Sequence, residues 1–359
     1  MIKHSDLDTL KDLANYLRCE ENELKDFLTK EFKVVDYSPD TIEYKARMIN
    51  VNELFNNSIT LQKMYIPKKN KKLGFRIVFS VKSRKYSNLL KTLNTYLKEI
   101  YSPSHIVHGF VENRNIKTNA SQHLAKKYLL SIDIKDFFET IDREMIHKSL
   151  IDLGFKVNIS EYISQLVTFN NKLVQGYNTS PTIANIVAQK FDAEIITLCK
   201  DKAVYTRYAD DLYFSSNNEL PKIELLTQIV NNNGFSLNND KTKYMYRGGK
   251  QFVTGLSVFD KNCPRVPNRI KKNLRLEIYH IKKWGVKSHI LKKMGYSFSD
   301  YSSSHEIAYI VNDEIEKTYA RINGWIQFIK SIELNLGMKL HKEFTKRTNY
   351  QGDDIYFTD

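Results

Sequence analysis

Three carboxylates in this chain have the types and spacing needed for metal-assisted phosphoryl chemistry. Asp210 and Asp211 are adjacent within an aromatic and apolar run, and Asp133 ends the apolar stretch Tyr-Leu-Leu-Ser-Ile-Asp. If the two expected strands pair, three anions meet at one sheet edge, where they cannot all stay ionised without a counter-charge. Mg²⁺ supplies that charge and keeps positions for water and phosphates. Two such ions would activate an attacking hydroxyl and stabilise a leaving oxygen. The alternative is that all three are ordinary turn acids.

The elements that would position these carboxylates are predicted from the periodicity of the apolar residues. Residues 128–138 are expected to form a buried strand that runs into a turn, residues 204–216 a hairpin, and residues 180–200 a helix. The order strand, helix, hairpin, helix, hairpin between residues 128 and 259 predicts a compact α+β sheet domain. Helical spacing from about residue 265 to 346, with a polar break near 296–305, predicts a helical domain at the C-terminus.

The residues before the sheet domain contain further predicted elements. The periodicity predicts two short helices within residues 6–33 and an amphipathic helix over residues 86–101. Between them, residues 63–81 alternate apolar and polar side chains around a Lys, Asn and Gly turn, which predicts a basic hairpin.

The composition excludes some classes of protein and favours others. A chain of 359 residues can form two or three domains without disulfides. Cys19, Cys199 and Cys263 are far apart with no CxxC pair, which favours the cytoplasm and argues against a zinc site. The acid-rich N-terminus does not have the pattern of a signal peptide, and no apolar run predicts a membrane span. The net charge of +14 favours a polyanionic partner, either nucleic acid or an acidic membrane face. A merely basic soluble protein is the alternative.

Three motifs in order resemble those of the reverse transcriptases, and in particular the bacterial retron type. They are Tyr-Ala-Asp-Asp at 208–211, Asp-Ile-Lys-Asp-Phe-Phe at 133–138 and Gln-Gly-Tyr-Asn-Thr-Ser-Pro-Thr-Ile-Ala-Asn at 175–185. The resemblance runs from about residue 64 to 260. It implies an α+β right-hand polymerase with fingers, palm and thumb. The implied ranges are an N-terminal helical extension over 1–60, fingers over 61–127 and 140–175, a palm over 128–139 and 176–260, and a helical thumb over 261–359.

The resemblance also implies roles in catalysis. Asp133, Asp210 and Asp211 would hold two Mg²⁺ ions, and the sequence leaves open whether Asp211 ligates as directly as the other two. Lys241 falls where such polymerases often place a lysine near the leaving pyrophosphate, and a cation there could donate a proton. Phe138 matches a steric-gate position that would exclude a ribonucleotide 2′-OH. Ordinary core packing is the alternative for Phe138.

A set of residues around the metal motifs would bind the incoming deoxynucleotide by the same resemblance. Glycine within this set would permit a close backbone approach. Solvation alone is the alternative for Lys72, as for the other lysines of the predicted basic hairpin. The set consists of Lys72, Arg76, Arg114, Asp136, Phe138, Gln175 and Gly176.

Two short elements resemble markers of the retron enzymes and would bind RNA or primer. Asn119 and His123 belong to an Asn-Ala-x-x-His element, and Val253, Thr254 and Gly255 form a Val-Thr-Gly element. Each is short. A helix N-cap with a capping-box partner at Gln122 would explain Asn119, and a plain strand would explain the Val-Thr-Gly element.

A basic cluster follows these elements. Residues 261–293 carry eleven Lys and Arg against the single acid Glu277, and Lys271, Lys272 and Arg275 would contact the phosphates of a duplex. A solvated helix face is the alternative. Trp325, on a later predicted helix, is expected in the core of this domain.

The resemblance implies an RNA-directed DNA polymerase that copies its own structured noncoding RNA from dNTPs. Synthesis would start from an RNA 2′-OH and give a branched RNA–DNA product, msDNA. A separate effector protein and a role in antiphage defence are implied, and a membrane is not. The alternatives are another bacterial reverse transcriptase, whether diversity-generating, intron-type or otherwise defence-associated, and a non-catalytic RNA-binding scaffold on the polymerase fold.

Overall fold

The computed structural model describes residues 3–29, 31–37, 59–67 and 74–345. It divides into two compact units, which we call the N-terminal unit (residues 1–115 and 127–245) and the C-terminal unit (residues 116–126 and 246–359). The N-terminal unit contains both helices and sheets whose strands pair mainly antiparallel, in agreement with the predicted α+β class. Residues 116–126 group with the C-terminal unit, although the sequence placed them with the fingers.

The basic hairpin is confirmed as the antiparallel pair β2 (Ile59–Pro67) and β3 (Phe75–Val81). Its predicted turn, which carries Lys72, lies outside the described residues. A third strand, β1 (Phe32–Tyr37), pairs parallel to β2. The expectation that residues 1–60 are helical is therefore wrong for β1, where β-branched Val34 and Val35 suit a strand.

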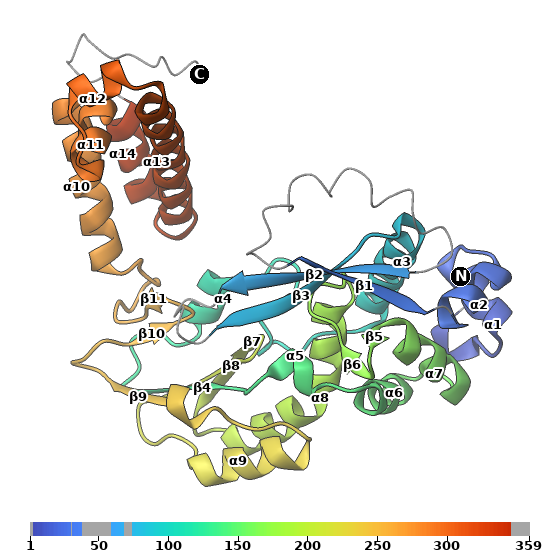
Figure 1. Ribbon diagram of the computed structural model, residues 1–359. Helices are drawn as coiled ribbons and strands as arrows, with labels where there is room; N and C mark the ends of the chain where they lie inside the picture. The colour runs from blue at the N-terminus through green and yellow to red at the C-terminus, as the bar shows by residue number, and fades with distance from the viewer. Residues whose placement is uncertain (1–2, 30, 38–58, 68–73, 346–359) are drawn as a thin grey trace. The chain divides into compact units, whose positions relative to one another are not determined.

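The central sheet of the N-terminal unit has the strand order β7-β8-β4-β9. The hairpin β7–β8 and strand β4 form as predicted. In Figure 1 the helices α8 and α9 cover one face of this sheet. The bounds are β4 Tyr128–Asp133, β7 Val204–Tyr208, β8 Asp211–Ser216, β9 Lys243–Tyr246, α8 Ser180–Cys199 and α9 Ile223–Asn232.

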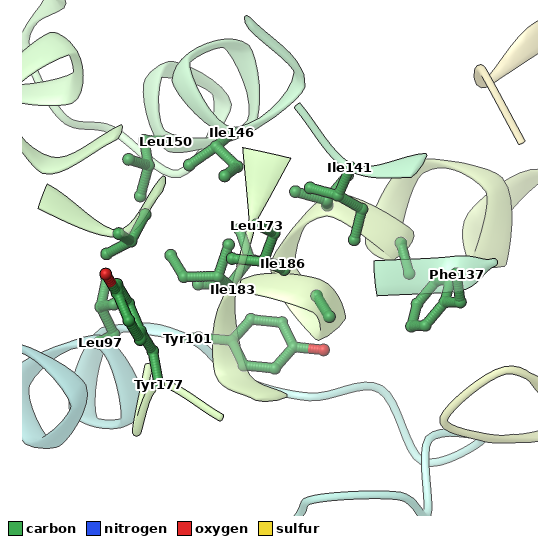
Figure 2. Close-up of a cluster of buried hydrophobic side chains, with 14 of the residues drawn as sticks. Leu97, Tyr101, Phe137, Ile141, Ile146, Leu150, Leu173, Tyr177, Ile183 and Ile186 are labelled. Atoms are coloured by element: carbon green, nitrogen blue, oxygen red, sulfur yellow. The ribbon is translucent and has the colours of Figure 1, made fainter. Parts of the chain in front are cut away.

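One continuous hydrophobic core joins these layers to the remaining helices of the N-terminal unit. Figure 2 shows part of it, in which side chains from α3, α6 and α8 gather around Leu173. The predicted N-terminal helices α1 and α2 are present and pack on α3 and α7. The remaining bounds are α1 Leu10–Leu17, α2 Glu21–Thr29, α3 Arg84–Ile100, α5 Phe137–Thr140, α6 Arg143–Asp152, α7 Val157–Leu166, β5 Thr168–Phe169 and β6 Lys172–Leu173, with short 3₁₀ turns η1 at His4–Asp6 and η5 at Asn239–Lys241.

The described residues of the C-terminal unit are mainly helical and include one small hairpin, in agreement with the predicted helical C-terminus. Helix α12 lies within the predicted polar break, where Ser297 and Asp300 form a capping box at its start. Trp325 is 37% exposed, so its predicted place in the core is wrong. The bounds are α4 Ile116–Ser121, β10 Phe252–Val253, β11 Leu256–Ser257, α10 Asn268–Trp284, α11 Val286–Met294, α12 Phe298–Ser303, α13 His305–Ile332 and α14 Leu334–Thr345.

Among the described residues, no helix combines the length and apolar character needed to cross a bilayer.

Candidate active site

The register of the central sheet brings the three predicted carboxylates to one edge. Strand β4 pairs antiparallel with β8, and Asp133 lies directly opposite Asp211. Asp210 occupies the turn between β7 and β8, and its carbonyl accepts a hydrogen bond from the Ile134 backbone N–H at 2.9 Å. The predicted pairing of these two strands is therefore confirmed.

The turn that presents Asp210 is tight and has an unusual backbone. Tyr208 pairs with Asp211, which leaves a two-residue loop of Ala209 and Asp210. Ala209 has a φ of +57°, a left-handed conformation that is unfavourable for a residue with a Cβ. A positive φ at the first loop position matches the twist of a two-residue hairpin. The surrounding structure must hold Ala209 in this conformation.

Burial and nearby negative charge act on the two adjacent carboxylates, Asp210 and Asp211. Burial raises the pKa of Asp211 to about 7, and the charges of Asp210 and Asp133 add to the effect. Burial also raises the pKa of Asp210, while the cations Lys241 and Arg76 oppose the shift. The Lys241 ammonium donates to both oxygens of Asp133, at 2.9 and 2.8 Å. This cluster of anions therefore requires a cation beside it.

The oxygens of the three aspartates suit a divalent cation. In the described part of the chain, however, no group of three His, Cys, Asp or Glu side chains is already placed to coordinate one ion. Carboxylate oxygens are the ligands that Mg²⁺ prefers. In this structure the ammonium of Lys241 lies on Asp133, where an ion would compete for the same oxygens. Asp133, Asp210 and Asp211 are the residues that would hold the metal.

The raised pKa of Asp211 gives a testable dependence on pH. Its folded pKa of about 7 lies above the ordinary value of 3.8, so its contribution to stability is lost as the pH rises from about 4 through about 7. A cation that binds the ionised form restores that stability. We expect MgCl₂ to raise the thermal unfolding temperature more at about pH 8 than at about pH 6. Asp211→Asn should reduce this difference. An equal Mg²⁺ effect at both pH values would contradict the assignment.

A cavity of about 330 Å³ opens between strands β2–β3 and residues 139–175 of the N-terminal unit. Arg76 and Gln175 both line it, and Gln175 donates to Glu139 at 2.9 Å. Lys63 also lines it, but its ammonium pairs with Asp36 at 3.2 Å. Arg76 has no carboxylate partner among the described residues, which leaves its charge available to an anionic ligand.

Gly176 is required by the protein's own backbone. Its φ is +110°, and a Cβ built there would lie 2.2 Å from the Phe79 carbonyl oxygen of β3. The Phe79 N–H donates to the Gln175 carbonyl at 2.8 Å. The close approach predicted for a nucleotide is therefore made, in this structure, by β3.

Phe138 is half-buried and lies edge-on to Phe110, with ring centroids 6.1 Å apart. Asp136 precedes α5 with a left-handed φ of +45° and is exposed. Phe110 is 46% exposed and has a φ of +61°. Sequence reasoning did not identify Phe110, because only the fold brings it next to the ring of Phe138.

The structure argues against the predicted nucleotide role of Arg114. Its guanidinium donates to the backbone carbonyls of Ser104 and Val107, the latter at 2.6 Å. Both bonds come from Nη1, and they hold the loop before Phe110 in place and turn this end of the guanidinium toward the protein backbone. The basic motif around Arg114 did not reveal this local use.

A fully buried network of charged and polar side chains supports the turn of Ala209 and Asp210, and the sequence did not predict it. The Arg207 side chain is 0% exposed and donates three hydrogen bonds of 2.8–3.0 Å to Asp192 of α8. Its Nη1 donates to the Ala209 carbonyl at 3.3 Å and to Asn185 Oδ1 at 2.9 Å. The Tyr205 hydroxyl donates to Asp192 at 2.7 Å. The network ties the left-handed turn to α8.

A second support for the turn comes from the backbone of residues 106–109. The Arg207 N–H donates to Ile106, and the Arg207 carbonyl accepts from His108. Gly109 follows, and a Cβ there would lie 2.4 Å from the Ala209 backbone nitrogen. Only glycine leaves room for the turn at this position.

The two short elements expected to bind RNA pack against each other inside the C-terminal unit. Asn119 and His123 are 0% exposed, and so is Val253, which places all three out of reach of an RNA. The Thr254 hydroxyl donates to the Ile116 carbonyl at 3.1 Å, and α4 packs on β10 and β11. The prediction of direct contact is wrong for the three buried residues. Thr254 and the exposed Gly255 form the accessible turn.

The basic residues predicted to contact phosphates differ in their exposure, because one of them forms an ion pair inside the C-terminal unit. Lys271 is largely buried and lies 3.1 Å from Glu333, which also receives Arg265 at 3.3 Å. Lys272 and Arg275 are exposed on α10. Lys271 therefore supports the helix packing, and Lys272 and Arg275 are the members of the predicted set that solvent can reach.

The family model and the sequence relatives agree on one family. The family described as "Reverse transcriptase (RNA-dependent DNA polymerase)" matches residues 66–298. The Retron Ec73 reverse transcriptase of Escherichia coli is 30% identical over 296 residues, covering 76% of this chain and 84% of that protein. The Retron Mx65 reverse transcriptase of Myxococcus xanthus is 31% identical, and the match covers 52% of this chain and only 48% of that relative. A telomerase structure from Candida albicans is similar at 11% identity, with a TM-score of 0.44 over 80% of this chain and 60% of that chain.

Proposed function

The chain belongs to the retron type of the reverse transcriptase family, and we propose that it synthesises DNA on an RNA template at the Asp133–Asp210–Asp211 site. The observation that carries this proposal is the register of β4 and β8, which sets Asp133 opposite Asp211 beside the Asp210 turn. A scaffold protein would have no need to bring three carboxylates to one sheet edge, where the pKa values of Asp210 and Asp211 are raised.

We propose a separate role for each residue of the site. Bound at the three aspartates, two Mg²⁺ ions would activate the primer hydroxyl and stabilise the leaving oxygen. Arg76 would bind the triphosphate, because its guanidinium lines the neighbouring cavity and offers paired donors. Lys241, released from Asp133, would hold or protonate the leaving pyrophosphate. Gln175 and Phe138 would position the base and the sugar.

The finer assignment follows the relatives. We propose that the protein binds its own structured RNA, starts synthesis from an RNA 2′-OH and retains a branched RNA–DNA product. A separate effector and a role in antiphage defence belong to the same proposal. The three cysteines form no disulfide, which suits the cytoplasm as its compartment.

Primer extension on a primed RNA template tests the basic activity. The purified protein should extend a DNA primer with dNTPs and Mg²⁺, and EDTA should stop the reaction. If an RNA-bound, folded protein gives no extension under any divalent cation, the scaffold alternative would replace the polymerase.

Phe138→Val should admit ribonucleotides. Its half-buried ring would no longer fill the space that a 2′-OH needs, and we expect the preference for dNTPs over rNTPs to fall roughly ten- to hundredfold. Extension rates with each nucleotide type measure the preference. Phe110→Leu, which removes only the neighbouring ring, is the matched control. Unchanged discrimination in Phe138→Val would make Phe138 a packing residue.

Salt dependence should separate the exposed cations from the paired one. Lys272→Gln with Arg275→Gln should weaken binding to a primer–template duplex. It should also flatten the plot of log affinity against log salt by roughly 0.7–0.9 for each phosphate that the protein no longer neutralises. Lys271→Gln is the matched control, because Glu333 already pairs with that ammonium. Equal slopes for both variants would show that α10 does not bind phosphates in this way.

A further inference from the structure

The C-terminal unit contains a cavity that the polymerase chemistry does not use. It has a volume of about 390 Å³ and is formed by side chains of α10 and α11 and none of the carboxylates described above. The lining residues are His280, Trp284, Ser288, His289, Lys292 and Lys293.

Three rings in this cavity form a parallel stack. His280 and Trp284 are four residues apart on α10, which places them on the same helix face. Their centroids are 4.7 Å apart and their planes differ by 11°. His289 of α11 continues the stack, 6.0 Å from His280 and at 12° to it. Trp284 remains 38% exposed, so the stack is open to solvent at one end.

The polar groups of the cavity are not fully satisfied by the protein. Nδ1 of His280 is buried without a hydrogen-bond partner among the described residues. His289 is differently placed, with its Nε2 3.7 Å from Glu277. Burial lowers the pKa of His289, which keeps its ring neutral near pH 7. The rings therefore offer flat faces for stacking and one buried nitrogen, Nδ1 of His280, that can accept or donate a further hydrogen bond.

Cations surround the open end of the stack. The ammonium of Lys283 lies 5.0 Å from the Trp284 ring centroid, and that of Lys292 lies 5.6 Å from it. Lys293 is paired with Glu314 at 3.3 Å, whereas Lys292 has no carboxylate partner in the described part of the chain. Both ammonium groups lie over the exposed Trp284 ring, so an entering base would displace them from the ring toward its own phosphate.

We propose that this cavity takes one unpaired nucleobase of an RNA, stacked on the Trp284–His280–His289 rings, with Lys283 and Lys292 on the adjoining phosphate. The proposal rests on the proposed function, because it assumes that RNA is the partner of this unit. An unpaired base is favoured over a paired one, since only unstacked bases can enter a cavity of this kind. The site would thus recognise a bulge or loop and add shape information to the phosphate contacts of α10.

Tryptophan fluorescence offers a direct measurement. The chain has two tryptophans, so Trp325→Phe leaves Trp284 as the only one. Three RNAs serve as probes: a duplex with one unpaired nucleotide, the same duplex with an abasic unit at that place, and the fully paired duplex. We expect the base-bearing RNA to quench Trp284 and to bind on the order of tenfold more tightly than the abasic one. The phosphate charge is identical in these two RNAs.

Matched variants separate the cavity from the rest of the surface. Trp284→Leu should abolish the tenfold preference, while Trp325→Leu, at a site of nearly equal exposure, should keep it. Circular dichroism melting confirms that both variants are folded. Equal affinity for the base-bearing and abasic RNAs would overturn the proposal, and so would equal losses in the two variants. Quenching by AMP alone, without preference among the RNAs, would also overturn it in favour of a mononucleotide site.

Failure of this proposal is distinguishable from failure of the polymerase. Primer extension on a fully paired primer–template does not require an unpaired base, so it should be unchanged in Trp284→Leu. Absence of any base preference in the wild-type protein, together with normal extension, overturns the cavity assignment alone.

Discussion

Asp210→Asn is expected to reduce DNA synthesis by about a thousandfold or more. Metal stabilisation of transition-state charge is worth several kcal/mol, and each 1.36 kcal/mol is tenfold in rate. The amide keeps the size of the side chain but removes the charge that Mg²⁺ needs. Asp133→Asn should have a similar effect, because its carboxylate stands opposite Asp211 in the same sheet edge. Steady-state extension on a primed RNA measures the loss.

The same substitution should not harm the fold. The Asp210 carboxylate is partly buried with a raised pKa, so its neutral amide should leave the unfolding temperature equal or higher at neutral pH. Asp240→Asn, at an exposed acid of the nearby η5 turn, is the control and should retain synthesis. Near-normal synthesis by Asp210→Asn would remove it from the metal site.

The second large effect is expected for the buried network of Arg207, Asp192 and Tyr205 that supports the turn of Ala209 and Asp210. Asp192→Leu alone should cost about 3–5 kcal/mol of unfolding free energy, because it leaves the Arg207 charge buried without its partner. Urea unfolding measures this loss. A triple replacement with Arg207→Met and Tyr205→Phe removes the charges and the hydroxyl together, and apolar replacements of this kind are often neutral or stabilising.

The triple variant tests whether the network positions the turn or only stabilises the fold. Without Arg207, the carbonyl of left-handed Ala209 loses its side-chain donor. We therefore expect a folded protein whose synthesis is reduced at least about tenfold and whose Mg²⁺ requirement is raised. RNA binding should be unchanged. A triple variant with wild-type synthesis and Mg²⁺ dependence would show that the network serves stability alone.

Local patterns predicted the part of this protein that depends on short-range order. The apolar run before Asp133 and the motif around Asp210 each predict a strand, and the condition that their carboxylates meet requires the pairing of β4 with β8 that the structure has. The helices were likewise visible from their apolar spacing. These features need only the residues within one or two elements.

Features that depend on distant partners were not predictable in the same way. Arg207 stands inside the β7–β8 motif, yet nothing near it in sequence shows that Asp192 of α8 will neutralise it. Arg114 and Lys271 were predicted to be available to bind phosphates. Only the fold shows that Arg114 donates to backbone carbonyls and that Lys271 pairs with Glu333. Asn119 and His123 were predicted to contact RNA because their element resembles a retron marker, and only the fold shows that both side chains are buried.

The nucleic acid that copurifies with the protein from its own cells tests the central claim most directly. The isolated complex is treated with RNase, with DNase and with a debranching enzyme, and the products are separated on a denaturing gel. If the protein is a retron reverse transcriptase, we expect a DNA strand attached to RNA. The mobility of this strand should change on debranching, and the strand should be absent from cells that carry Asp210→Asn. The contradicting result is that the wild-type protein and the variant, both expressed and folded, each copurify with RNA and no DNA.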